Sequence, residues 1–282
     1  MFIFKILSLF PLWSLYLLTD MVYLLGYFVI GYRKKIIFKN IREAFPQKSE
    51  KEVETIAKKF FRNLTDSFAE IIKSYSISAQ DLDNRVKIIN HHLVTQAIED
   101  GQVIIGLQGH FFNWEWHLLQ MTANIEKRCD VVYAKVSNPF FEKLMMTIRT
   151  RFGVDMVEKE AFQRDFLKKR NLPRLIVLAA DQRPGNRDIR YWTKFMNRET
   201  AFFEGAEKLA KRFKHPVIYA HVHKPKRGHY VFTYEIMDQP PYEGNPDHSI
   251  TDRFIHLLEA NIREQPETYL WSHNRWKWKK GD

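Results

Sequence analysis

The sequence predicts a layered α/β domain, with a mixed, largely parallel sheet flanked by helices and an apolar, membrane-associated helix at its N-terminus. Two observations predict this. Short apolar runs of strand length alternate along most of the chain with segments whose apolar residues recur at helical spacing. Such alternation is typical of parallel sheets, because consecutive parallel strands are usually joined by a helix. The first thirty-two residues differ from the rest because they are almost uncharged.

Residues 1–32 are expected to form a membrane anchor. From the sixth residue onward their only charged side chain is Asp20, and a helix over this run, rising about 1.5 Å per residue, is long enough to cross a hydrocarbon core of about 30 Å. Pro11, Asp20 and Gly26 leave a kinked span or helices lying in the interface as alternatives. The basic residues 33–35 place the following flank on the cytoplasmic side. A cleaved signal peptide is less well supported, because the apolar run is too long and lacks a small-x-small site.

Residues 33–282 are expected to form a single domain, since no linker rich in Gly, Pro or Ser divides them. Ser49 and Glu52 form a capping-box pattern at the start of a long helix that ends near Tyr75. The strands that follow are predicted at 86–89, 103–107, 131–134, 174–180, 216–222 and 230–236. The helices between and after them are predicted at 94–99, 113–125, 139–151, 160–170, 199–213 and 250–264.

The residues 110–115, His-Phe-Phe-Asn-Trp-Glu, carry the main candidate for chemistry. Side chains five apart on one helix point away from each other, so His110 and Glu115 meet only if the chain turns between them. A strand, a turn at Gly109 and a helix capped by Asn113 supply that turn. The helix dipole then favours an ionised Glu115 by roughly 0.3–1 kcal/mol. A carboxylate beside an imidazole orients it and raises its basicity, which predicts a general base that activates a substrate hydroxyl.

A single histidine near a glutamate at a strand end is more often structural than catalytic. A second polar motif favours the catalytic interpretation, because Asp181, Gln182 and Arg183 follow the strand 174–180. If the two strands are neighbours, both motifs face one crevice at the carboxyl ends of the sheet.

The formal net charge of +11 predicts a partner that is anionic: nucleic acid, anionic lipid or an acidic carrier protein. Residues 271–280 mix Trp with Lys and Arg, which suits base stacking or a membrane interface. The apolar N-terminus favours the membrane, so we expect no nucleic-acid partner. The single cysteine, Cys129, excludes an intramolecular disulfide and is consistent with a reducing compartment.

A metal site is not expected. The sets His110, Glu115, His117 and His221, His223 lack a further ligand at a recognised spacing. There is also no glycine-rich nucleotide loop, so we expect no cofactor. The arginines are each typical of a solvated surface, but together near the crevice they can bind lipid phosphates through bidentate hydrogen bonds; they are Arg149, Arg151, Arg183, Arg187 and Arg190.

In these residues the chain resembles the late acyltransferases of lipid A biosynthesis, within the lysophospholipid acyltransferase superfamily. The resemblance covers nearly the whole chain and includes its apolar N-terminus. Its motifs are Asn40-Ile41-Arg42-x-x-Phe45-Pro46, H-x-x-x-x-E at His110 and Glu115, Asn138-Pro139 with Arg149, Asp181-Gln182 with Gly185, and Tyr269-Leu270-Trp271-x-His273-x-Arg275. Phe112 stands where the family commonly has glycine, and Tyr133-Ala134-Lys135 replaces a more usual Tyr-Arg start.

The resemblance implies transfer of an acyl chain from acyl carrier protein thioester to a hydroxyl of a lipid A precursor, at the cytoplasmic face of the bacterial inner membrane. It implies that His110 and Glu115 are catalytic, and that Asn113, Arg149, Arg151, Asp181, Gln182 and Arg183 lie around the anionic glycolipid or phospholipid acceptor. It implies neither a metal nor a covalent acyl-enzyme. Two alternatives stay open: a lysophospholipid or aminolipid acceptor, and a membrane-docked protein that binds anionic lipid without chemistry.

Overall fold

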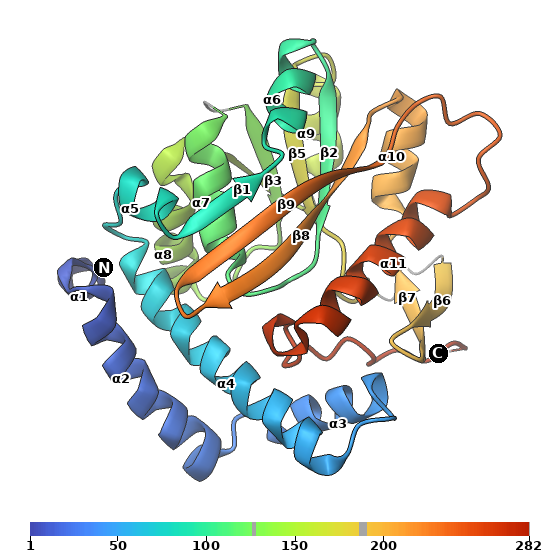
Figure 1. Cartoon of the computed structure of the whole chain (residues 1–282). Helices are drawn as coiled ribbons and strands as arrows, with labels where there is room; N and C mark the ends of the chain where they lie inside the picture. Colours follow the sequence, from blue (N-terminus) through green and yellow to red (C-terminus); the bar gives the residue numbers. More distant parts are fainter. Residues whose placement is uncertain (126–127, 186–190, 282) are drawn as a thin grey trace.

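The computed structural model describes residues 1–125, 128–185 and 191–281 (Figure 1). Its main sheet has the strand order β1-β9-β8-β2-β5-β3-β4, and every neighbouring pair is parallel except β8 and β9. This confirms the predicted mixed, largely parallel sheet. The strands of this sheet are β1 Val86–Ile89, β2 Val103–Gln108, β3 Cys129–Tyr133, β4 Asp155–Glu158, β5 Arg174–Ala179, β8 Val217–Lys226 and β9 His229–Asp238.

Helices flank the sheet, and a small hairpin, separate from that sheet, lies near the C-terminus of the chain (Figure 1). The capping box of Ser49 and Glu52 begins the long helix α4, as predicted. The helices are α1 Phe2–Leu9, α2 Leu12–Leu24, α3 Lys34–Ala44, α4 Glu50–Lys73, α5 Ala79–Asp83, α6 His92–Glu99, α7 Trp114–Asn124, α8 Pro139–Arg149, α9 Phe162–Lys168, α10 Gly205–Phe213 and α11 Ser249–Glu264; the hairpin strands are β6 Tyr191–Phe195 and β7 Arg198–Phe202.

Strands β2 and β5 lie side by side at the centre of the sheet. Their register pairs Val103 with Arg174 at one end and Gln108 with Ala179 at the other. A side chain at Gly106 would meet the Leu175 methyl at 3.1 Å, so the glycine allows close packing between these strands. Because the pair is parallel and in register, the polar motifs that follow both strands emerge at the same edge of the sheet.

The predicted helix 199–213 was wrong in its first part. Residues 198–202 form strand β7, which pairs antiparallel with β6, and helix α10 begins only at Gly205. The short strand β4 was also not predicted. In both cases pairing with a neighbouring strand decides the structure, and such pairing is not visible in the local period of apolar residues.

The N-terminal segment lies along α4 (Figure 1). Helix α2 continues into the π-helix Leu25–Ile30, and together they form, among the described residues, one helix apolar and long enough to cross a membrane. One face, with Leu15 and Tyr16, is buried against the domain, whereas Leu17 on the opposite face is 59% exposed. A separate anchor over residues 1–32 stays a prediction.

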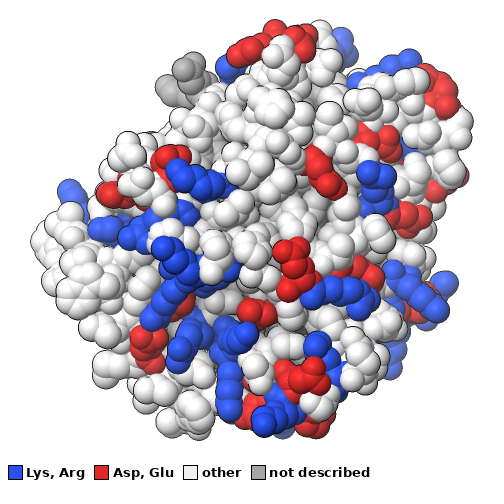
Figure 2. Space-filling model, viewed as in Figure 1, with Lys and Arg blue, Asp and Glu red and all other residues white. Residues whose placement is uncertain are grey.

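An ion pair fixes α2 against the domain at its midpoint. Asp20 accepts from Arg227 at 2.7 Å, and Arg227 also contacts the buried Asp66 of α4 at 2.5 Å. The only charge in the apolar run is therefore directed inward. Figure 2 shows the result on one face of the molecule: Lys and Arg gather along α3 and α4, while the edge made by α1 and α2 is largely uncharged.

Candidate active site

The turn between β2 and α7 has the predicted form. A Cβ atom at Gly109 would lie 2.5 Å from Leu258 and 2.7 Å from the Phe111 ring, so any larger residue would require these buried side chains to shift. Asn113 then caps α7, because its Oδ1 accepts hydrogen bonds from the backbone N–H of Glu115 at 2.9 Å and of the next residue at 3.1 Å. The strand, the turn and the cap are thus confirmed.

His110 pairs with Asp181, the second residue after the end of β5. Its Nδ1 lies 2.6 Å from Asp181 Oδ1, and its backbone N–H donates to Oδ2 at 3.0 Å. Burial by itself raises the pKa of Asp181, but the attraction and hydrogen bonds of His110 outweigh burial, so the pKa is lowered. An ionised Asp181 favours the tautomer with the proton on Nδ1, which leaves the lone pair of Nε2 to act as a base.

Glu115 does not hold the imidazole, and this corrects the expected His110–Glu115 contact. In the described part of the chain its carboxylate accepts from Arg149 Nε at 2.8 Å, from Arg149 Nη2 at 2.5 Å and from Trp114 Nε1 at 2.9 Å. The reason is positional: the first turn of α7 directs Glu115 toward the end of α8, while the neighbouring strand supplies His110 with Asp181.

The Glu115–Arg149 pair is largely buried, with Glu115 side-chain exposure of 3% and Arg149 exposure of 17%. Burial by itself lowers the pKa of Arg149, but the attraction of Glu115 outweighs it, so the pKa is raised. The guanidinium therefore stays charged, in a bidentate geometry that fixes its orientation. The site contains two ion-paired units, a histidine with an aspartate and an arginine with a glutamate.

Both units border a cavity of about 490 Å³, which lies within the usual size range of ligand sites. Its polar lining includes His110, Glu115, Arg149, Gln182 and Arg183. Most of the remaining lining is apolar and comes from α7, from the strands β3, β4 and β5, and from α9; it includes Leu118, Met121, Val131, Met156, Phe162, Val177 and Leu178. A cavity with polar groups and an apolar lining suits a lipid with a reactive polar end.

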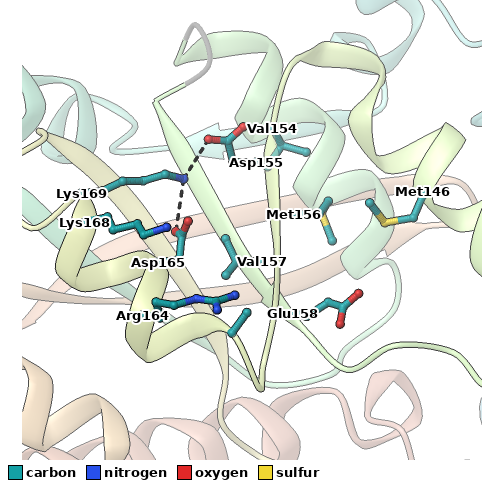
Figure 3. A pocket seen from close by; sticks show the side chains of 11 residues that line it. Met146, Val154, Asp155, Met156, Val157, Glu158, Arg164, Asp165, Lys168 and Lys169 are labelled. Carbon is teal, nitrogen blue, oxygen red and sulfur yellow. Dashed lines mark hydrogen bonds and ion pairs between the residues drawn. The ribbon is translucent and has the colours of Figure 1, made fainter.

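A second pocket, of about 450 Å³, contains none of the predicted site residues. Figure 3 shows Lys169 of this pocket directed at two carboxylates: its Nζ lies 3.1 Å from Asp155 and 3.2 Å from Asp165. These charges largely compensate each other, so the first cavity is the better candidate for the site.

Asp181, predicted as a substrate contact, pairs with His110 instead, and the other predicted substrate-binding residues divide into two groups. Gln182 and Arg183 line the cavity with Arg149. Asn113 and Arg151 do not line it, which corrects the expectation for both: Asn113 is only 2% exposed, and Arg151 donates to the carbonyl oxygen of Ser74 at 2.5 Å. Both side chains hold the end of one element against another. Arg187 and Arg190 lie outside the described residues.

The other candidate histidines of the sequence, His117, His221 and His223, all have polar partners. His117 is buried, with Nδ1 at 2.7 Å from Gln108 Oε1 and Nε2 at 2.8 Å from the Tyr234 hydroxyl, and burial lowers its pKa to about 3. His221 and His223 both contact Glu264. Across residues 1–125, 128–185 and 191–281, no group of three or more His, Cys, Asp or Glu side chains is arranged to hold a metal ion.

The C-terminal segment also supports the site, which the residues alone do not predict. Leu270 N–H donates to the His110 carbonyl at 3.1 Å, and Tyr269 forms an isolated bridge with Phe111. A hydrogen bond from Tyr269 to Asp181 contributes to the raised pKa of the tyrosine, although burial is its larger cause. No spacing rule connects residues so far apart, and only the order of the family motifs indicated this segment.

Comparison with known proteins gives a family for the chain. Residues 1–278 match the family model described as bacterial lipid A biosynthesis acyltransferase. No match was found among curated protein sequences. Among solved structures, the 1-acyl-sn-glycerophosphate (LPA) acyltransferase PlsC from Thermotoga maritima is similar, with a TM-score of 0.43 and 9% identity, over 90% of this chain and 96% of that one.

Proposed function

Because the chain belongs to the family of bacterial lipid A biosynthesis acyltransferases, we propose that it moves a fatty acyl chain from acyl carrier protein thioester to a hydroxyl of a lipid A precursor or related glycolipid. Acyl transfer to a lipid acceptor follows from the family. The donor and the acceptor are proposals. The observation that supports them best is the cavity itself, in which His110, held by Asp181, borders an apolar lining.

In the proposed reaction His110 Nε2 takes the proton of the acceptor hydroxyl as its oxygen attacks the thioester carbonyl carbon. The tetrahedral intermediate collapses, the carbon–sulfur bond breaks, and the departing sulfur takes the proton from the imidazolium to leave as a thiol. Asp181 stabilises the imidazolium while it exists and fixes its tautomer. No acyl-enzyme forms, because the acceptor itself is the nucleophile.

Glu115 keeps a catalytic role in this proposal, through Arg149. A guanidinium held in place beside the reacting carbonyl stabilises the oxyanion of the tetrahedral intermediate. Glu115 supplies the bidentate contacts that hold the guanidinium before substrate arrives. The general base and the oxyanion donor would then each have their own carboxylate partner, Asp181 and Glu115.

The cavity lining and the charge of the chain support the proposed substrates. Each methylene group of an acyl chain that leaves water for an apolar lining contributes about 0.8 kcal/mol. Arg183, which lines the cavity, is suited to a headgroup phosphate. The net charge of +11 attracts both an acidic carrier protein and an anionic lipid.

We place the protein at the bacterial inner membrane, with an anchor formed by residues 1–32 and a catalytic domain formed by residues 33–282 on the cytoplasmic side. The exposed outer face of α1, α2 and the π-helix supports membrane contact. Basic residues 33–35 follow this segment directly and support the cytoplasmic assignment.

The test is acyl transfer by the purified full chain in lipid–detergent micelles, with acyl carrier protein thioester as donor. We expect His110→Ala to lower the rate by at least about a hundredfold, while His256→Ala, an exposed position on α11, retains the parent rate. Equal rates for both variants would exclude His110 as the base.

Parallel assays with lysophospholipid and aminolipid acceptors identify the acceptor. A parent protein that binds liposomes without turning over any acceptor would support the alternative of a lipid-binding protein without chemistry.

A further inference from the structure

A buried carboxylate outside the cavity lies directly behind the active-site turn. Glu70, on α4, is 0% exposed. It accepts hydrogen bonds from three other parts of the fold: the Tyr16 hydroxyl of α2 at 2.7 Å, the Tyr230 hydroxyl of β9 at 2.9 Å and the Asn113 amide at 2.7 Å. Four segments distant in sequence thus converge on one side chain.

The contact with Asn113 determines how that amide is oriented. Its Nδ2 donates to Glu70 Oε2, which leaves Oδ1 to accept the N–H groups of Glu115 and Trp116 at the start of α7. If the amide rotated by half a turn, it would present a donor to those N–H groups and the cap would be lost. The carboxylate of Glu70 therefore selects the orientation in which α7 is capped.

A second contact ties the same helical turn to α4. The indole Nε1 of Trp116 donates to the Glu70 carbonyl oxygen at 3.1 Å and to the Ser74 hydroxyl at 2.9 Å. The first turn of α7, which carries Glu115, is thus held from behind at two points. Glu115 in turn holds Arg149 at the cavity.

We propose that Glu70 is a positioning residue of the acyl-transfer site: by fixing the Asn113 amide it fixes the first turn of α7, and with it the Glu115–Arg149 pair. The inference rests on the proposed function and extends it to a residue that touches no substrate. The Tyr16 hydroxyl joins the inner face of the apolar N-terminal helix to the same carboxylate.

A Glu70→Gln substitution tests the contact with little change in volume. In the orientation that places its amide nitrogen at the Oε2 position, glutamine faces the Asn113 amide donor to donor, and either this hydrogen bond or the cap of α7 is lost. The opposite orientation sets the same nitrogen against the Tyr16 hydroxyl, which donates to Oε1 in the parent. We expect kcat to fall at least about tenfold, with KM for the acyl donor within about twofold, because Glu70 does not line the cavity.

The matched control is Asp66→Asn, a buried carboxylate one turn earlier on α4 that pairs with Arg227 instead. This control lowers the thermal midpoint but leaves kcat near that of the parent.

The decisive variant exchanges the two groups. Glu70→Gln combined with Asn113→Asp restores the hydrogen bond with donor and acceptor reversed, and Asp caps a helix about as well as Asn. Asn113→Asp alone sets two carboxylates against each other and is expected to be impaired. The double variant should recover to within about threefold of the parent kcat, beyond either single variant. A double variant no better than the single ones would overturn the proposal.

Backbone hydrogen exchange at Glu115 and Trp116 provides a readout that does not need acyl transfer. Glu70→Gln should speed exchange of these two capped amides at least about tenfold, the double variant should restore slow exchange, and the milder Tyr16→Phe should speed it by a smaller factor. Slow, parent-like exchange in folded Glu70→Gln would also overturn the proposal. A parent protein that transfers no acyl group would contradict the proposed function, while the exchange rates still decide the role of Glu70.

Discussion

At the residue scale, the site separates two carboxylates that the sequence presents as similar candidates. Asp181 pairs with the imidazole of His110, and Glu115 pairs with the guanidinium of Arg149. The spacing within residues 110–115 predicted the turn and the Asn113 cap, because these are local features. The partner of His110 lies 71 positions away, so only the neighbourhood of β2 and β5 decides it. The available signal is the position of Asp181 at a strand end, which predicts a residue of the site but not its partner.

Substitution of either carboxylate is expected to lower kcat, in each case through a different partner. Asp181→Asn should lower kcat by about 10²–10⁴, because asparagine cannot stabilise the imidazolium and permits the wrong tautomer. Glu115→Gln should lower kcat by at least about a hundredfold, because it disturbs Arg149 rather than His110. Single-turnover rates of acyl transfer for both variants check this, and an unchanged kcat in either variant would contradict the role assigned to that carboxylate.

Arg149→Lys tests the orientation of the cation without removing its charge. Lysine cannot reproduce the bidentate contacts to Glu115, so the charge is no longer fixed at the cavity. We expect kcat to fall by about 10–10²-fold, with KM changed by less than about threefold, if Arg149 acts on the transition state. A rise in KM at unchanged kcat would instead assign Arg149 to substrate binding.

At the element scale, the helices with strong caps were predictable, and the elements defined by pairing were not. The capping box of Ser49 and the caps at Asn113 and Asn138 depend only on residues a few positions apart, and all three helices begin at these caps. The strand β7 is defined by its partner β6, so the sequence 198–202 alone was consistent with a helix. Helix α2 is similar: its composition predicts contact with lipid, but only the structure shows that one face is bound to α4.

The outer face of α2 should bind membrane without supporting the fold. Replacing the exposed Leu17 and Met21 together by serine should weaken binding to phosphatidylglycerol-containing vesicles at least about tenfold, because each side chain contributes about 1.5–3 kcal/mol when buried in lipid. The free energy of unfolding should change by less than about 0.5 kcal/mol. Leu15→Ser, on the buried face, is the reverse control and should destabilise the fold by about 2–5 kcal/mol. Cosedimentation and urea unfolding measure the two effects, and undiminished vesicle binding by the outer-face variant would contradict this role.

At the scale of the whole molecule, the ends of the chain enclose the site. Asn40 Nδ2, in α3, donates to the Trp271 carbonyl oxygen at 2.9 Å. The two residues before Trp271, Tyr269 and Leu270, contact the turn at His110. Arg275, only 3% exposed, lies near enough to Asp181 to favour its charged form, although His110 has the larger effect. The family motifs at the two ends are therefore parts of one support, which no local pattern in the sequence reveals.

The free energy of unfolding should depend on pH because His117 is buried in its neutral form. Burial lowers its pKa from 6.5 to about 3, so below about pH 6.5 the unfolded chain binds a proton that the folded chain does not. Its contribution to the free energy of unfolding is complete above that pH and is lost as pH falls toward 3, by at most about 1.4 kcal/mol per pH unit. Glu70, whose pKa burial raises, acts in the opposite direction, but it cancels in a comparison of variants. Urea unfolding of the parent and His117→Gln between about pH 7.5 and about pH 5 should therefore show a stability difference that favours the parent most at the higher pH and shrinks with acidification. A difference independent of pH would mean that His117 takes up its proton equally in both states.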